Sequence, residues 1–91
     1  MYGCSNQKAD RLKERIFPWL FGKRYENFKF DQCNFELEKG RDGTARVVMW
    51  REFNLINSFT LETTFCGATD GRYKDCHFSI AALKECGRQF C

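Results

Sequence analysis

The sequence predicts an α/β layered domain, on three observations. Helical patterning occurs near both ends of the chain, strand-like alternation occurs between them, and no internal repeat or low-complexity linker interrupts this order. Of the 91 residues, 43% are hydrophobic and 30% are charged, which is typical of a folded soluble domain. We therefore expect residues 1–91 to form part of one domain with a small core.

The first predicted element is an amphipathic helix over residues 8–21. Leu12, Ile16 and Leu20 recur at helical spacing, with charged residues on the opposite face. Pro18 lies inside this pattern, and proline removes a backbone donor and disrupts the preceding turn of a helix. We therefore expect the helix to end or kink near Phe17, with a separate turn at residues 19–22.

Two segments in the middle of the chain predict strands. Residues 34–39 alternate apolar and acidic side chains, and residues 40–43 follow with turn chemistry. Residues 58–65 alternate more regularly, and one of their two faces carries only polar side chains. The carboxylate of Glu62 lies on that face among hydroxyl groups.

The segment Ala45 to Phe53 is ambiguous. Its β-branched and aromatic residues favour a strand, whereas Thr44 is a plausible N-cap for a short helix. Trp50 and the phenylalanines are interpreted as core residues.

The last predicted element is a helix that follows Ser79, a residue type that caps helix N-termini. Its apolar positions recur at helical spacing, although Gly87 weakens it. The pattern continues to Cys91 without a stop signal, so we expect the sequence to be cut at its end.

The six cysteines include no Cys-x-x-Cys pair, and the N-terminus has no signal-peptide pattern. We therefore expect reduced, mostly buried thiols, with a small secreted disulfide protein as the alternative. The single histidine, His77, lies beside Cys76 and Asp75. Adjacent residues of an extended segment point to opposite faces, so His77 is expected on the surface and not in a zinc site.

The charge pattern argues against two classes of partner. The net charge is +3, and the basic residues are scattered among acids instead of forming a stripe, so nucleic-acid binding is not expected. No apolar run is long enough to span a membrane. A cytoplasmic setting follows as the default.

Four motifs together resemble a known family. The stretches MYGC, RVVMWRE, NSFTLETTFCG and HFSIAALKECGRQFC resemble the closing part of the catalytic domain of the cytosolic carboxypeptidases, the deglutamylase branch of the zinc metallocarboxypeptidases. The resemblance implies a partial, truncated α/β sandwich with a mixed sheet flanked by helices, and a short helix at Ala45 to Phe53. It also implies Zn²⁺ as cofactor, glutamate-rich tails such as those of polyglutamylated tubulin as substrates, and a cytoplasmic, cytoskeletal or ciliary location.

The resemblance assigns roles to two residues. Glu62 matches the acid of the TLE motif, which in the family is the general base that activates a zinc-bound water. Arg46 resembles the specificity residue at the floor of the pocket for the C-terminal side chain, where a guanidinium can pair bidentately with a glutamate.

The chain also departs from the family pattern. The family's zinc ligands are a His-x-x-Glu pair and a later histidine, all of which should precede Met1. The chain contains no histidine before His77, so it should carry no metal ligands and be inactive alone. The alternative is a non-catalytic interaction module that binds acidic tails. In either case we expect low stability or self-association through unpaired sheet edges.

Overall fold

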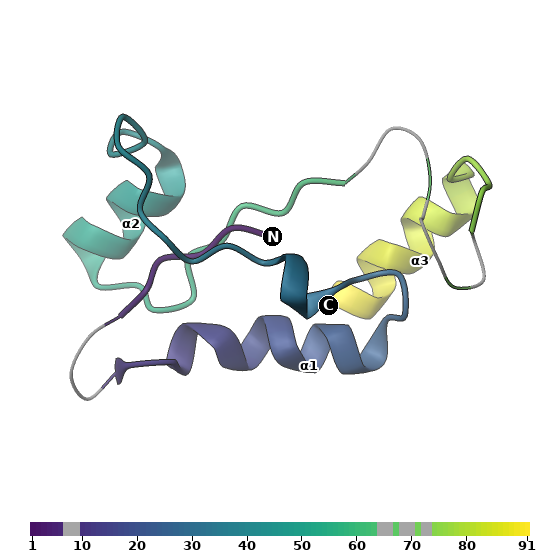
Figure 1. Ribbon diagram of the computed structural model, residues 1–91, viewed down its shortest axis with the longest axis horizontal. Coiled ribbons are helices and arrows are strands. Elements are labelled where there is room, and N and C mark those ends of the chain that lie inside the picture. Colours follow the sequence, from purple (N-terminus) through teal and green to yellow (C-terminus); the bar gives the residue numbers. More distant parts are fainter. Residues whose placement is uncertain (7–9, 64–66, 68–70, 72–73) are drawn as a thin grey trace.

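The computed structural model describes residues 1–6, 10–63, 67, 71 and 74–91. These contain the α-helices α1 (Ile16–Arg24), α2 (Ala45–Phe53) and α3 (Ile80–Phe90), and the 3₁₀ turns η2 (Lys13–Arg15) and η3 (Phe30–Gln32). Helix α1 packs against α3, while α2 lies at the other end of the molecule, and extended segments cross the space between them (Figure 1). No described helix is long and apolar enough to cross a membrane.

The prediction of an α/β fold is wrong for the described residues, which contain helices and no strand. Strand-like pairing is limited to isolated bridges, in which Tyr2 pairs with Asn34 and with Thr60, and Gly67 pairs with His77. Neither the partial sandwich nor its sheet is present in this part of the chain.

The predicted strand at residues 34–39 does not form, because a side chain takes one of the backbone hydrogen-bond donors that a strand would need. The Oδ1 atom of Asn34 accepts a hydrogen bond from the Glu36 backbone N–H at 2.9 Å, which removes that donor from any ladder. Phe35 is buried, but Leu37 is 43% exposed, so the alternation does not continue into a buried face.

Of the described residues 58–63 in the second predicted strand, only Thr60 forms a bridge. Thr60 exchanges two 2.9 Å backbone hydrogen bonds with Tyr2. Leu61, Glu62 and Thr63 are exposed, and residues 64–66 lie outside the described part. Alternation predicts which face a residue occupies, but a strand also needs a partner along its length.

Helix α1 begins later and ends later than predicted. Leu12 adopts the left-handed conformation (φ 69°), which separates residues 10–11 from the helix, and η2 follows it. Pro18 does not end the helix, contrary to the prediction, because it is the third residue of α1. Backbone N–H groups in the first turn have no intrahelical acceptor, so proline is tolerated there.

The other two helices agree with the sequence. Ala45–Phe53 is helical, as the resemblance implied, and Thr44 stands at its N-cap without a side-chain capping bond. At α3, the Ser79 hydroxyl accepts from the Ala82 N–H at 3.2 Å, so the predicted cap is confirmed.

Two clusters form the interior. The first is aromatic and lies between α1 and α3, where Phe21 contacts Phe28 at 4.5 Å and Phe90 at 5.5 Å between ring centroids. The second joins the N-terminal segment to α2 and contains the fully buried Cys4 and Val47. Trp50 is half-buried and Phe53 is 65% exposed, so the assignment of Trp50 and the phenylalanines to the core is only partly correct.

Candidate functional site

Arg46 lies in the first turn of α2 and is held at its backbone. Its carbonyl accepts a hydrogen bond from the Ser58 hydroxyl at 2.8 Å and a longer one from the Cys4 thiol at 4.0 Å. Its guanidinium carbon lies 5.8 Å from the centroid of the Tyr2 ring. The Nε atom is buried and makes no hydrogen bond. An unpaired buried donor of this kind is a candidate contact for a polar ligand.

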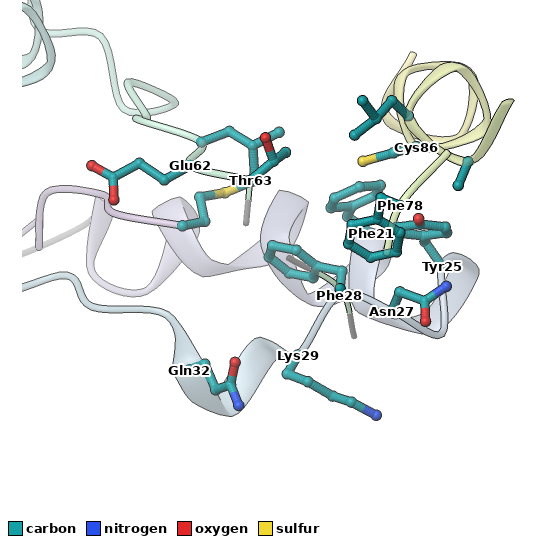
Figure 2. A pocket seen from close by; sticks show the side chains of 15 residues that line it. Phe21, Tyr25, Asn27, Phe28, Lys29, Gln32, Glu62, Thr63, Phe78 and Cys86 are labelled. Atoms are coloured by element: carbon teal, nitrogen blue, oxygen red, sulfur yellow. The ribbon is translucent and has the colours of Figure 1, made fainter. Parts of the chain in front are cut away.

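Glu62 lies on the extended segment that follows Thr60, and its side chain is exposed. It stands at the edge of a cavity of about 350 Å³ whose inner wall is formed by Phe21, Phe28 and Cys86. Figure 2 shows the Glu62 carboxylate directed away from the aromatic side chains of that wall. The acid is therefore accessible to water, which a general base requires.

The N-terminal segment connects the two predicted site residues. Tyr2 contacts Arg46 through its ring and pairs with Thr60 through its backbone. Thr60 and Glu62 are two residues apart on the same segment. The structure thus places Arg46 and Glu62 on segments that both adjoin Tyr2.

Sequence reasoning missed a buried polar network beside this segment. Glu14 is only 1% exposed, and its carboxylate accepts from Asn6 Nδ2 at 3.0 Å and lies 3.5 Å from Arg15 Nε. Asn6 Oδ1 accepts from Trp50 Nε1 at 2.7 Å. No spacing or motif links these residues, which lie on three separate parts of the chain. Asn6 and Glu14 also stand in polar and charged stretches of the sequence, so their types gave no signal of burial.

The described cysteines are not joined to one another. Of the five described cysteines, only Cys4 is fully buried, so the expectation of mostly buried thiols is wrong for this part of the chain. Burial raises the pKa of the Cys4 thiol, and the guanidinium groups of Arg46 and Arg51 partly oppose that increase. Burial likewise raises the pKa of the Cys33 and Cys86 thiols. Cys66 lies outside the described residues.

The donor set does not fit a carboxypeptidase zinc site. Across the described ranges, no group of three or more His, Cys, Asp or Glu side chains could hold a metal ion. His77 is exposed, as predicted, and pairs through its backbone with Gly67. It is also the only histidine in the sequence, whereas the family pattern requires two.

Comparison with known proteins finds relatives among the cytosolic carboxypeptidases. The chain is 47% identical over 93 residues to "Cytosolic carboxypeptidase 2" of Mus musculus, a match that covers 100% of this chain and 11% of that relative. It is 43% identical over 95 residues to "Cytosolic carboxypeptidase 3" of Bos taurus, covering 100% of this chain and 9% of the relative. It is 34% identical over 105 residues to "Cytosolic carboxypeptidase 1" of Danio rerio, again over 100% of the chain.

The chain is thus similar along its whole length to cytosolic carboxypeptidases, and it spans about a tenth of the length of these relatives. The resemblance predicted from the motifs is thereby confirmed at the level of the family. No family model matches the chain, and no solved structure matches it.

Proposed function

We propose that these 91 residues are a segment of a zinc metallocarboxypeptidase catalytic domain that removes C-terminal glutamates from protein tails such as those of polyglutamylated tubulin. The observation that carries the proposal is the match to cytosolic carboxypeptidases along the whole chain. Glu62 and Arg46 lie on segments that adjoin the same N-terminal residue, which supports a shared site.

Glu62 is proposed to act as the general base. Its exposed carboxylate can accept a proton from the water that attacks the terminal peptide bond, and later return that proton to the leaving amine. A carboxylate within hydrogen-bond distance of that water can take up its proton, whereas the neutral amide of Glu62→Gln can accept a hydrogen bond but not the proton.

Arg46 is proposed to select glutamate at the C-terminus. A guanidinium can form two parallel hydrogen bonds with a side-chain carboxylate but not with the neutral amide of glutamine. The unpaired Nε of Arg46 supports this role, since a substrate carboxylate would supply the missing acceptor.

This chain alone is expected to be inactive, because its described residues do not form the family's metal site. The test is incubation with Zn²⁺ and a glutamate-ended peptide, followed by detection of released glutamate. We expect no release above the buffer blank. Turnover that disappears in Glu62→Gln would show that the chain builds a complete site.

A second function is favoured by the same arginine and by the net charge of +3. In this alternative, the chain is a non-catalytic module that binds acidic tails. Binding should then weaken as salt increases, because screening reduces attraction between exposed charges, and should be unaffected by a metal chelator. Salt-independent binding would argue against the module.

The location is proposed from the relatives, whose names describe them as cytosolic. We propose a cytoplasmic chain that associates with glutamylated microtubules of the cytoskeleton or cilia. Co-sedimentation with microtubules carrying long or short glutamate chains tests this, and equal recovery with both would contradict it.

A further inference from the structure

The proposed function assigns no role to Tyr2 of the MYGC motif. Tyr2 lies between the segment that carries Glu62 and the helix that carries Arg46. Its backbone is fixed on two sides, since it exchanges two 2.9 Å hydrogen bonds with Thr60 and forms a parallel bridge with Asn34. The ring therefore projects from a well-anchored position.

The ring of Tyr2 meets a side chain that is itself restrained. Arg46 is held at its carbonyl by Ser58, and its guanidinium carbon lies 5.8 Å from the Tyr2 ring centroid. This is within the range of a cation–π contact, in which a cation is attracted to the negative face of the ring. Arg46 is thus fixed at both ends, by Ser58 at the backbone and by Tyr2 at the guanidinium.

We propose that Tyr2 is a positioning residue for Arg46: its ring holds the guanidinium in the orientation that pairs with the side-chain carboxylate of a C-terminal glutamate. This rests on the proposed role of Arg46. Tyr2 is 36% exposed, so the residue is not enclosed by the protein. The tyrosine hydroxyl is not needed for the role, because the contact is with the ring.

The first experiment measures recognition. The affinities of the chain for a glutamate-ended peptide and for the same peptide ending in glutamine are compared by fluorescence anisotropy. Tyr2→Leu should lower the ratio of the two affinities about two- to fivefold, the magnitude of an exposed cation–π contact. Tyr2→Phe should keep the wild-type ratio, and Arg46→Lys should lower it, because lysine lacks the bidentate geometry.

The second experiment measures the orientation of Arg46 without any peptide. The Nε–H signal of Arg46 is assigned in a ¹H–¹⁵N spectrum by its loss in Arg46→Lys. Because this group is buried, its hydrogen exchange should be slow. Tyr2→Leu should shift the signal and accelerate exchange, whereas Tyr2→Phe should do neither. A structural role of Tyr2 unrelated to Arg46 would leave this signal unchanged.

The outcomes separate the inference from the proposed function. An unchanged affinity ratio and an unchanged Nε–H signal in Tyr2→Leu would overturn the positioning role, even if Arg46→Lys abolishes discrimination. If Arg46→Lys leaves the ratio unchanged, recognition by Arg46 fails, and with it any role of Tyr2 in recognition, whatever the signal does.

Discussion

At the scale of single residues, the structure depends on polar groups inside a small interior. Asn6 occupies the centre of one network, because its amide donates to Glu14 and accepts from Trp50. These contacts connect the N-terminal segment, η2 and α2. Sequence patterns describe apolar periodicity, and therefore could not predict a network whose members share neither spacing nor element.

The network gives the first prediction. Asn6→Ala leaves the 1% exposed Glu14 carboxylate without its amide donor and the Trp50 indole without its acceptor, so we expect a loss of about 2 kcal/mol in the free energy of unfolding. Urea denaturation followed by tryptophan fluorescence measures it. Asn57→Ala, at an exposed position, is the matched control and should change stability little. An equal effect of both variants would contradict the network's role.

Cys4 gives a second prediction at this scale. Burial raises the pKa of the Cys4 thiol and blocks access to it. Iodoacetamide should therefore modify Cys4 at least about tenfold more slowly than the exposed Cys91 at pH 8, as measured by peptide mass spectrometry. The buried thiol has a higher pKa in the folded than in the unfolded protein. Its contribution to the free energy of unfolding is therefore fully present below the ordinary thiol pKa of 9.0 and decreases above it, because the unfolded thiol ionises first. Cys4→Ala should remove that part of the alkaline decline, and equal pH profiles for both proteins would contradict the assignment.

At the scale of elements, the sequence predicted helices better than strands. A helix satisfies its backbone locally, so capping and periodicity suffice to identify α3, and Ser79 was found in this way. The strands at residues 34–39 and 58–65 were wrong because a strand depends on its neighbours. Among the described residues, the N-terminal segment forms bridges with Asn34 and Thr60 and donates one further hydrogen bond, from Ser5 to Phe35, which does not make a ladder. The prediction that Pro18 ends the helix was wrong for a different reason. Proline disrupts the interior of a helix but not its first turn, and the sequence did not show that α1 begins at Ile16.

The cap of α3 gives a prediction for an element. Ser79→Ala removes the acceptor of the Ala82 N–H and should destabilise the protein by about 1 kcal/mol. Ser79→Asp retains a capping oxygen and serves as the control. Thermal unfolding and the helical signal in circular dichroism provide the measurement. If alanine and aspartate lower stability equally, the hydroxyl does not function as a cap.

At the scale of the whole molecule, the chain is more open than a typical domain of its length. Its radius of gyration is 14.4 Å, and a compact domain of this size has roughly 12 Å. Helix α1 is apolar on its outer side as well, where Ile16, Trp19 and Leu20 are 57%, 48% and 52% exposed. A helix with apolar side chains on all sides is normally buried on all sides by other parts of a protein.

Self-association is therefore expected, through α1 and not through the sheet edges anticipated from the sequence. Sedimentation velocity should show oligomers that increase with protein concentration, and the double variant Ile16→Glu with Leu20→Glu should be monomeric. Ala81→Glu, at an exposed position of α3, is the control and should still associate. A monomeric wild-type chain at all concentrations would contradict this expectation.

The central claim is that Glu62 and Arg46 perform the chemistry and the recognition of a carboxypeptidase. The most direct measurement replaces the aligned segment of the Mus musculus relative, to which the chain is 47% identical, with these 91 residues and follows glutamate release. We expect an active chimera. Glu62→Gln should lower kcat at least about a hundredfold, and Arg46→Ala should remove the preference for glutamate over glutamine. A Glu62→Gln chimera as active as its parent would contradict the account.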